Sequence, residues 1–328
     1  MTATQVTVKP GETFRYYSDT LYWNDFPEIQ AHLNHLATGH STTDWMTMLE
    51  RYPPAQRLLS LNCGNGWVER KLCTRGHARS VVGLDISEDL LAEARRLAAH
   101  EGVVADYRVA DANMTSLAAL GFDHVLNHAA LHHVAYIDRL VREVLIHMPE
   151  HGLLINYDYV GPHRNQYEWE AWSRMIELWD EMPEQLRTPL DYPPFKTMVA
   201  GDPTEAVHSE LIVDTLRRYF DIVDMRALGG AIAYQMLWNN VGLHQARETW
   251  HGAYWLNRII EADIEFTDGK LESSLFAVLI CRPRKAVLHD TEQLALWTKE
   301  ENEREEQASR NGGRYYPRRA LEILYENR

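Results

Sequence analysis

Short apolar runs alternate with amphipathic stretches over residues 57–160. Between the runs, apolar residues recur at spacings of three and four, which predicts helices, whereas the compact runs predict buried strands. This regular alternation predicts an α/β architecture with a parallel sheet. The five expected strands cover residues 57–61, 81–85, 105–110, 122–126 and 153–159.

Helix-boundary signals support this pattern. Ser87 is a suitable N-cap, and Glu88 and Asp89 follow it in the first turn, where the helix dipole favours negative charge. Gly76 and Gly102 lie where the first two helices are expected to end. We therefore expect two strand–helix units before the third strand begins.

Beyond residue 160 the strict alternation stops. Residues 161–220 are rich in Trp and Pro and predict helices. One helix is expected to begin at Asp202-Pro203-Thr204-Glu205, which combines an N-cap, a proline and an acidic residue three positions after the cap. Two further strands are expected at 222–226 and 275–281, with helices between them and without the regular alternation of residues 57–160.

The composition is that of a globular protein with one large domain or a domain with insertions: 328 residues, 45% of them hydrophobic. The net charge of −14 argues against general nucleic-acid binding. No apolar run is long enough to span a bilayer, and Cys63, Cys73 and Cys281 lack disulfide or zinc spacing, so we expect a cytoplasmic location. The acidic run 300–306 predicts a solvated helix or tail.

The most informative stretch is the turn Asn62-Cys63-Gly64-Asn65-Gly66, which joins the first expected strand to its helix. Glycine allows positive φ and lets a ligand approach the backbone closely, while the N–H groups that start the helix face that ligand. Asp85 then ends the second strand, where a carboxylate can take ribose hydroxyls in a nucleotide-binding unit. A tight turn without a ligand is the alternative.

Two other nucleotide-binding classes fit this turn poorly. The dinucleotide fingerprint requires glycines at positions 62, 64 and 67, but Asn62 and Trp67 occupy two of them, which opposes a NAD-dependent oxidoreductase. The Lys-Ser/Thr pair of a phosphate-binding loop is also absent.

The stretch instead resembles the first motif of class I S-adenosylmethionine (SAM)-dependent methyltransferases, although Ser60 replaces the family's acidic residue and Asn62 its first glycine. The resemblance implies a Rossmann-like seven-stranded sheet of order 3-2-1-4-5-7-6, with a helical N-terminal cap and helical insertions after strands 5 and 6. S-adenosyl-L-methionine is the implied cofactor. Asp111, which follows the third strand, would accept from the adenine amino group. The implied cofactor-binding residues are Asn62, Cys63, Gly64, Asn65, Gly66, Asp85, Ile86, Asp111, Ala112 and Asn127.

The segment Asn127-His128-Ala129-Ala130-Leu131-His132-His133 resembles the Leu-His-His motif that follows strand four in this family. His132 and His133 are candidate catalytic bases, because the pKa of histidine lies near working pH; packing or capping the loop is the alternative role. His128 and His132 have helical metal-pair spacing, but no carboxylate or cysteine lies at a standard distance along the chain. No metal is therefore expected.

The segment from Asn156 to Gln166 resembles a stretch of a bacterial small-molecule and sugar-type methyltransferase subfamily, which also carries segments like 202–209 and Gly229-Gly230. Asp158 is the third candidate catalytic residue. His163 and Arg164 are expected either to orient or deprotonate the acceptor or to pair with each other in a lid.

The resemblance covers residues 20–283 and implies methyl transfer to a hydroxyl, less readily an amine, of a small polar metabolite or sugar-containing product of secondary metabolism. A SAM-binding or partner subunit without turnover is the alternative. The expected partners are a small-molecule acceptor and a second copy in a homodimer, but neither nucleic acid nor membrane. The expected divisions are a helical cap (1–56), a SAM-binding core (57–160), a lid and acceptor region (161–220), closing strands with a helical insertion (221–283) and a charged extension (284–328).

Overall fold

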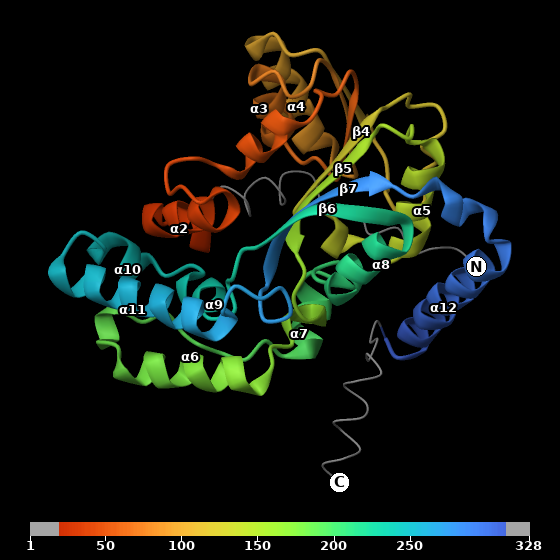
Figure 1. Cartoon of the computed structure of the whole chain (residues 1–328). Coiled ribbons are helices and arrows are strands. Elements are labelled where there is room, and N and C mark those ends of the chain that lie inside the picture. The colour runs from red at the N-terminus through yellow and green to blue at the C-terminus, as the bar shows by residue number, and fades with distance from the viewer. Residues whose placement is uncertain (1–19, 313–328) are drawn as a thin grey trace.

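A seven-stranded sheet forms the centre of the computed structural model, which describes residues 20–312 (Figure 1). The strand order is β3-β2-β1-β4-β5-β7-β6, which confirms the order expected from the sequence. Strands β1 to β5 pair in parallel, and β7 is antiparallel to both β5 and β6. The strands are β1 Leu58–Leu61, β2 Val81–Asp85, β3 Ala105–Val109, β4 His124–His128, β5 Leu153–Tyr159, β6 Phe220–Ala227 and β7 Phe276–Pro283.

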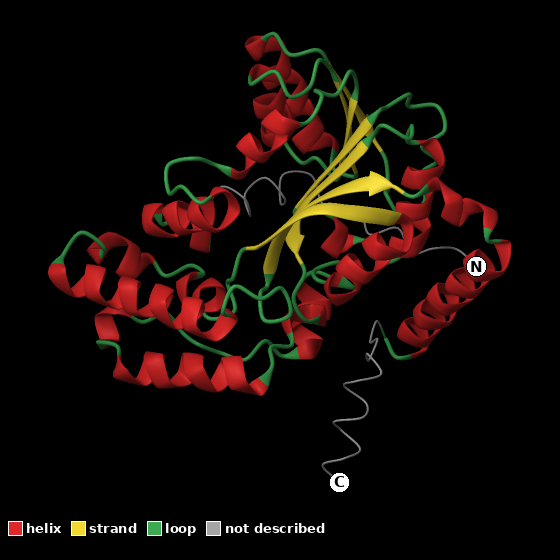
Figure 2. Cartoon of the chain, in the orientation of Figure 1, coloured by secondary structure: helices red, strands yellow, loops and turns green. Residues whose placement is uncertain are grey.

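Helices cover both faces of the sheet (Figure 2). In β7, Ala277 and Leu279 belong to one buried cluster, whereas Val278 and Ile280 belong to the other. Successive side chains of a strand point to opposite faces, so each face of the sheet buries its own row of apolar residues. The helices that follow core strands or pack with them are α3 Trp67–Thr74, α4 Glu88–Glu101, α5 Ile137–His147 and α8 Ile212–Tyr219.

The expected boundaries of α4 are confirmed. The Ser87 hydroxyl accepts a hydrogen bond from the N–H of Leu90 at 3.4 Å, and Gly102 ends the helix with φ of 69°. Glu88 and Asp89 occupy the first turn as predicted.

Strand β4 differs from the expectation of 122–126, because it begins at His124 and continues through His128. Asn127 pairs with Leu61 on one side and with Asn156 on the other, so the neighbouring strands extend β4 by two residues. Asn127 and His128 therefore lie within the strand instead of following it.

The cap and insertion helices gather beyond the carboxyl ends of the parallel strands. The arrowhead of β7 points away from α2, α6 and α9, and β7 is antiparallel to β5, so the parallel strands run towards these helices (Figure 1). Residues 1–19 of the expected cap and 313–328 of the expected extension lie outside the described residues. The remaining short helices and the helices of the cap and insertions are η1 Trp23–Asp25, α2 Pro27–Thr38, η2 Trp45–Arg51, η3 Leu131–His133, η4 His163–Asn165, α6 Trp169–Glu181, η5 Glu184–Leu186, α7 Phe195–Gly201, η6 Ser209–Leu211, α9 Ala233–Leu237, α10 Val241–Ala246, α11 Trp250–Thr267 and η7 Lys285–His289.

The prediction of a helix beginning at Asp202 is wrong. Residues 202–208, which we call the lid loop, form turns and bends, and the next α-helix is α8. The guanidinium of Arg164 donates to the carbonyls of Asp202, Pro203 and Glu205 at 3.3, 2.6 and 2.9 Å. These carbonyls therefore bind an arginine from η4 instead of building a helical hydrogen-bond ladder.

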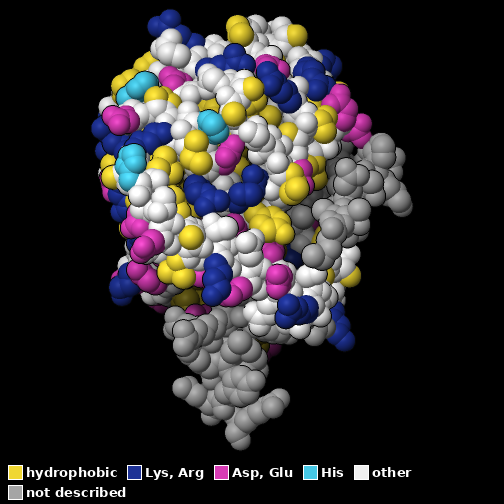
Figure 3. All heavy atoms as spheres, turned by 90° about the vertical axis from the view of Figure 1, so that its right-hand side faces the viewer, with side chains coloured by type: hydrophobic (Ala, Val, Ile, Leu, Met, Phe, Trp, Pro, Cys, Tyr) yellow, Lys and Arg dark blue, Asp and Glu magenta, His cyan; other side chains and the backbone are white. Residues whose placement is uncertain are grey.

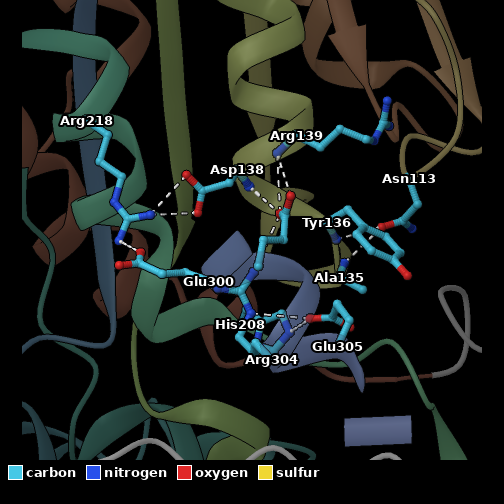
Figure 4. Close-up of polar contacts among 11 residues, drawn as sticks. Asn113, Ala135, Tyr136, Asp138, Arg139, His208, Arg218, Glu300, Arg304 and Glu305 are labelled. Carbon is cyan, nitrogen blue, oxygen red and sulfur yellow. Dashed lines mark hydrogen bonds and ion pairs between the residues drawn. The ribbon is translucent and has the colours of Figure 1, made fainter. Parts of the chain in front are cut away.

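The prediction of a solvated helix or tail at 300–306 is wrong for Glu301. This residue lies in α12, Thr291–Arg310, and is 4% exposed. Its carboxylate accepts from the N–H groups of Asp138 at 2.8 Å and of Arg139 at 3.1 Å, which lie in the first turn of α5 and lack partners within that helix. Arg218 of α8 reaches Asp138 at 3.0 Å and Glu300, the residue before Glu301 in α12, at 3.2 Å (Figure 4).

The face formed by α5, α8 and α12 carries cationic, anionic and apolar side chains in a mixture (Figure 3). Among residues 20–312, no helix combines the length and the apolar character needed to cross a membrane.

Candidate active site

The turn after β1 and the end of β2 are joined by hydrogen bonds from one carboxylate. Asp85 is 8% exposed, and its two oxygens accept from the N–H groups of Gly64 and Ser87, each at 2.8 Å. Burial raises the pKa of Asp85, and these backbone donors oppose that rise. Asp85 therefore lies directly beside the glycine turn, as the sequence predicts.

Gly66 occupies a position that no other residue can take without rearrangement. Its φ is 74°, and a Cβ there would lie 2.4 Å from the hydroxyl oxygen of Tyr107 on β3. Gly64, with φ of 55°, has no described atom within 4 Å of the position of an added Cβ, so the backbone is open on that side. Gly66 is therefore needed for packing against Tyr107, and Gly64 leaves room for a ligand.

The backbone conformation of Asn62 explains why an asparagine can replace the first glycine of the family pattern. Its φ is 46°, a left-handed conformation that asparagine tolerates better than most residues, and its side-chain amide donates to the carbonyl of Ala130 at 3.2 Å. This bond links the turn after β1 to the loop after β4. Cys63 and Asn65 complete the same turn, and the Asn65 carbonyl accepts from Arg70.

Asp111, Ala112 and Ile86 lie at the ends of β3 and β2. Asp111 is exposed, and its Oδ1 accepts from the N–H of Asn113 at 2.8 Å. Ile86 is 47% exposed, whereas Ala112 is buried. Their roles in cofactor binding stay predictions, as do those of the turn residues.

The side chain of Asn127 lies deeper than the sequence analysis expected. It is 1% exposed and donates to Asn156 at 2.5 Å and to Asp158 at 2.7 Å. The observed contacts of this side chain therefore position Asp158.

His132 and Asp158 form a buried pair at the ends of β4 and β5. Nδ1 of His132 lies 2.5 Å from Oδ1 of Asp158, and the two residues are 7% and 0% exposed. Burial lowers the pKa of His132, but the Asp158 carboxylate outweighs it and raises that pKa to about 9. Burial likewise disfavours the Asp158 anion, yet His132 and Asn127 hold its pKa below the usual value.

The lid loop brings a carboxylate to this pair that the sequence analysis did not assign to the site. Oε2 of Glu205 lies 3.9 Å from Nε2 of His132 and 3.8 Å from Nε2 of His133. Nδ1 of His133 lies 3.1 Å from the hydroxyl of Thr204. The sequence analysis interprets Asp202-Pro203-Thr204-Glu205 as the start of a helix, and this interpretation does not bring Glu205 to the site.

The imidazoles of His132 and His133 and the carboxylate of Glu205 offer ligand atoms within 4.8 Å of one another. Two imidazole nitrogens and one carboxylate oxygen are a donor set that can hold a cation. The same three groups can also bind and deprotonate a hydroxyl. Burial and the neighbouring His132 lower the pKa of His133, which keeps this second imidazole neutral.

His128 lies in an aromatic stack and belongs to neither metal-competent group of the described residues. Its ring stacks with Tyr157 at 4.9 Å and with Trp45 of the cap at 6.0 Å, and Trp67 meets it edge-on at 5.4 Å. Burial lowers the pKa of His128 to about 4, so the ring is neutral. The sequence analysis did not predict this aromatic wall of Trp45, His128 and Tyr157, because Trp45 lies far from the other two along the chain.

His163 and Arg164 hold the lid loop. Nδ1 of His163 donates to the carbonyl of Val207 at 2.6 Å, and Arg164 binds lid-loop carbonyls as described above. Of the two roles expected from the sequence, these contacts favour a structural role in the lid, although the two residues bind the loop instead of each other.

Comparison with known proteins places the central part of this chain in a family. The profile of a family described as "Methyltransferase domain" matches residues 59–155. Ubiquinone biosynthesis O-methyltransferase of Sinorhizobium fredii is 39% identical over 82 residues, which cover 25% of this chain and 32% of the relative. The enzyme of the same name from Agrobacterium fabrum is 35% identical over 85 residues, covering 26% and 33%. The chain thus spans about a third of the length of these curated relatives.

This region is a class I SAM-dependent methyltransferase domain. Among solved structures, a SAM-dependent methyltransferase from Mesorhizobium loti is 21% identical, with a TM-score of 0.43, covering 73% of this chain and 96% of the other. Phosphoethanolamine N-methyltransferase 2 of Haemonchus contortus, solved with SAM, is 16% identical with a TM-score of 0.47, covering 81% and 60%. SAM is the cofactor of this methyltransferase domain. His132 follows β4 within the matched residues, whereas Asp158 of β5 and Glu205 of the lid loop lie beyond them.

Proposed function

We propose that this protein transfers the methyl group of SAM to a hydroxyl of a small polar molecule, and that His132 removes the acceptor's proton. The observation that carries the proposal is the 2.5 Å contact between Nδ1 of His132 and Oδ1 of Asp158. A buried carboxylate fixes the imidazole with Nδ1–H towards Asp158, so Nε2 carries the lone pair that accepts a proton.

The chain's own residues would prepare the acceptor. Neutral His132 takes the hydroxyl proton on Nε2 as the oxygen becomes nucleophilic, and Asp158 stabilises the imidazolium that results. Glu205 lies near Nε2 and can hold the acceptor in line by a hydrogen bond. Bound SAM supplies an electrophilic methyl group on a sulfonium.

The cofactor would lie against the glycine turn. The residues present fit it, because the backbone of Gly64 is open and Asp85 stands next to it with its carboxylate fixed. Gly66 and Asn62 shape the turn, and Asp111 and Ile86 at the next strand end would meet the adenosine part.

The acceptor would be neutral or cationic and would contain an apolar part. Glu205 favours a hydroxyl or amine donor over a phosphate, since like charges repel. The aromatic wall of Trp45, His128 and Tyr157 offers flat apolar surface. A sugar-containing product of secondary metabolism meets these requirements, and the O-methyltransferase names of the partial relatives agree with a hydroxyl acceptor.

We further propose a cytoplasmic homodimer. Val223 and Met225 are 44% and 39% exposed on β6, the edge strand of the sheet, where a second copy can pair. Light scattering after gel filtration tests this point: a single species at the mass of one chain would contradict it.

The test of function begins with calorimetric titration of the full-length protein with S-adenosylhomocysteine, followed by transfer of labelled methyl groups to a panel of hydroxyl and amine acceptors. Binding with transfer to hydroxyls supports the proposal. Binding without transfer to any acceptor in the panel favours the alternative, a SAM-binding subunit without turnover. Failure of the folded protein to bind contradicts both.

A matched pair of variants then tests the base. His132→Gln should retain S-adenosylhomocysteine binding and lose methyl transfer, whereas His133→Gln, which changes the adjacent ring, should lose less. Equal activity of the two variants would exclude His132 as the base.

A further inference from the structure

A second group of two histidines and a glutamate lies behind the lid loop, and the proposed methyl transfer does not use it. His163, His208 and Glu210 offer ligand atoms within 4.8 Å of one another. They come from η4 after β5, from the end of the lid loop and from η6. His163 is 5% and His208 0% exposed, so this group is more deeply buried than the one around His132.

Hydrogen bonds to the other ring nitrogen fix the tautomer of each imidazole. Nδ1–H of His163 donates to the Val207 carbonyl at 2.6 Å, which places the ring's lone pair on Nε2. Nε2–H of His208 donates to Oε1 of Glu305 at 2.6 Å, which places the lone pair on Nδ1 (Figure 4). The two rings are nearly parallel, with an interplanar angle of 19° and centroids 5.9 Å apart.

This arrangement is the one that metal-binding histidines require. A ligating imidazole usually donates its second N–H to a carbonyl or carboxylate, which orients the ring and raises its basicity as a ligand. Val207 and Glu305 supply one acceptor of each kind.

Glu210 provides an independent observation. Both of its carboxylate oxygens are buried, and neither accepts a hydrogen bond from another residue within 20–312. Buried carboxylates are almost always hydrogen-bonded or bound to a cation, because desolvation is otherwise costly.

We propose that His163, His208 and Glu210 bind a divalent transition-metal ion, Zn²⁺ by the chemistry of its ligands. Two imidazole nitrogens and one carboxylate oxygen are a common zinc donor set, and a water would complete a tetrahedron. Ligand atoms around tetrahedral zinc lie on the order of 3.3 Å apart, given metal–ligand bonds of about 2.0 Å. The three ligand atoms, which lie within 4.8 Å of one another, would therefore approach by up to about 1.5 Å on binding.

The neighbouring charges are compatible with a cation. Arg164 and Arg304 are the nearby arginines, but each is engaged: Arg164 with lid-loop carbonyls and Arg304 with Glu301 and Glu305. Both guanidinium groups therefore already have acceptors among residues 20–312.

The ion would add to the hydrogen bonds that already join these parts of the chain, such as the one from the N–H of Arg164 to the carbonyl of Ala206 at 2.7 Å. It would connect η4 to the end of the lid loop and, through Glu305, to α12. Since the lid loop also carries Glu205, the ion would fix the position of that carboxylate beside His132.

Metal analysis of the full-length protein, purified without chelators from zinc-supplemented medium, tests the proposal. We expect about one zinc per chain in the wild type and less than about a fifth of that in Glu210→Gln, which preserves the side-chain shape. Glu205→Gln is the matched control, because it makes the same change in the other histidine–glutamate group and should retain the zinc. Circular dichroism establishes that both variants are folded.

A second readout is independent of purification history. Chelator-treated wild type should melt at a lower temperature and regain several degrees when Zn²⁺ is added, because an ion that binds only the folded state stabilises it. Glu210→Gln should show no such gain. Folded wild type that neither contains nor responds to zinc overturns the proposal, as does zinc that is lost in Glu205→Gln but kept in Glu210→Gln. Neither measurement depends on methyl transfer.

Discussion

Asp158 holds His132 through a 2.5 Å contact from its Oδ1 to Nδ1 of the ring, although the carboxylate itself has no exposed surface. The N–H groups of Leu131 and Tyr159 donate to Asp158 at 2.8 Å each, and the Asn127 amide donates at 2.7 Å. These donors stabilise the anion in a buried place, which is why it can orient the imidazole and raise its pKa.

The rate of methyl transfer should increase with pH up to about 9. Only neutral His132 can accept a proton, and the neighbouring Asp158 raises the pKa of His132 to about 9. Single-turnover rates with saturating SAM between pH 6 and 10 measure the midpoint. In Asp158→Asn that midpoint should fall, and the plateau rate should drop by roughly 10²–10⁴-fold. A profile that is flat in the wild type would contradict the role of His132.

Replacement of Asp85 by alanine should weaken S-adenosylhomocysteine binding by roughly 10–100-fold, the size expected for losing charged hydrogen bonds worth about 1.5–3 kcal/mol. The change removes the partner of Gly64 and Ser87 as well as the proposed ribose contact. Calorimetry provides the dissociation constants. Asp106→Ala is the control, since Asp106 of β3 forms ion pairs with Arg57 and Arg108 and its loss should leave the affinity unchanged.

The parts of this protein that the sequence predicts are local ones. The turn 62–66, the end of β2 at Asp85 and the caps of α4 depend on neighbours within a few residues, and all were located correctly. The approach of Glu205 to His132 was not predictable, because the lid loop takes its shape from Arg164, itself in a left-handed conformation with φ of 53°. Periodicity carries no information about contacts of that kind.

Glu69 should make the protein less stable at pH 8 than at pH 5. Burial raises the pKa of Glu69 to about 7. Folding therefore favours the protonated acid, and this stabilisation is present below about pH 4.5 and is lost as the pH rises through 7. Glu69→Gln should be more stable than the wild type at pH 8 by up to about 3 kcal/mol, with little difference at pH 5.

Urea unfolding at the two pH values measures this difference. Glu88→Gln is the control, because Glu88 is 61% exposed at the side chain and pairs with Arg95 on the surface. It should change stability far less than Glu69→Gln at pH 8, because an exposed ion pair contributes little. An equal effect of both substitutions would show that the burial of Glu69 is not the cause.

Loss of the Glu301 carboxylate should destabilise the protein by about 0.5–2 kcal/mol, the range for removing a helix cap. Glu301→Ala leaves the N–H groups of Asp138 and Arg139 without their acceptor. Glu303→Ala, two residues further along α12, removes only a surface pair with Lys299 at 3.7 Å and should have almost no effect. Thermal unfolding of both variants distinguishes a cap from a general effect of charge.

The contact between Glu301 and α5 also has a consequence for the order of events during synthesis. Asp138, which donates the hydrogen bond, and Glu301, which accepts it, are 163 positions apart in the chain. At roughly 5–20 residues per second, the ribosome delivers the start of α5 about 8–30 seconds before the residue that caps it. During that interval the N–H groups of Asp138 and Arg139 are bound to water, and the first turn of α5 is capped only after Glu301 has been synthesised.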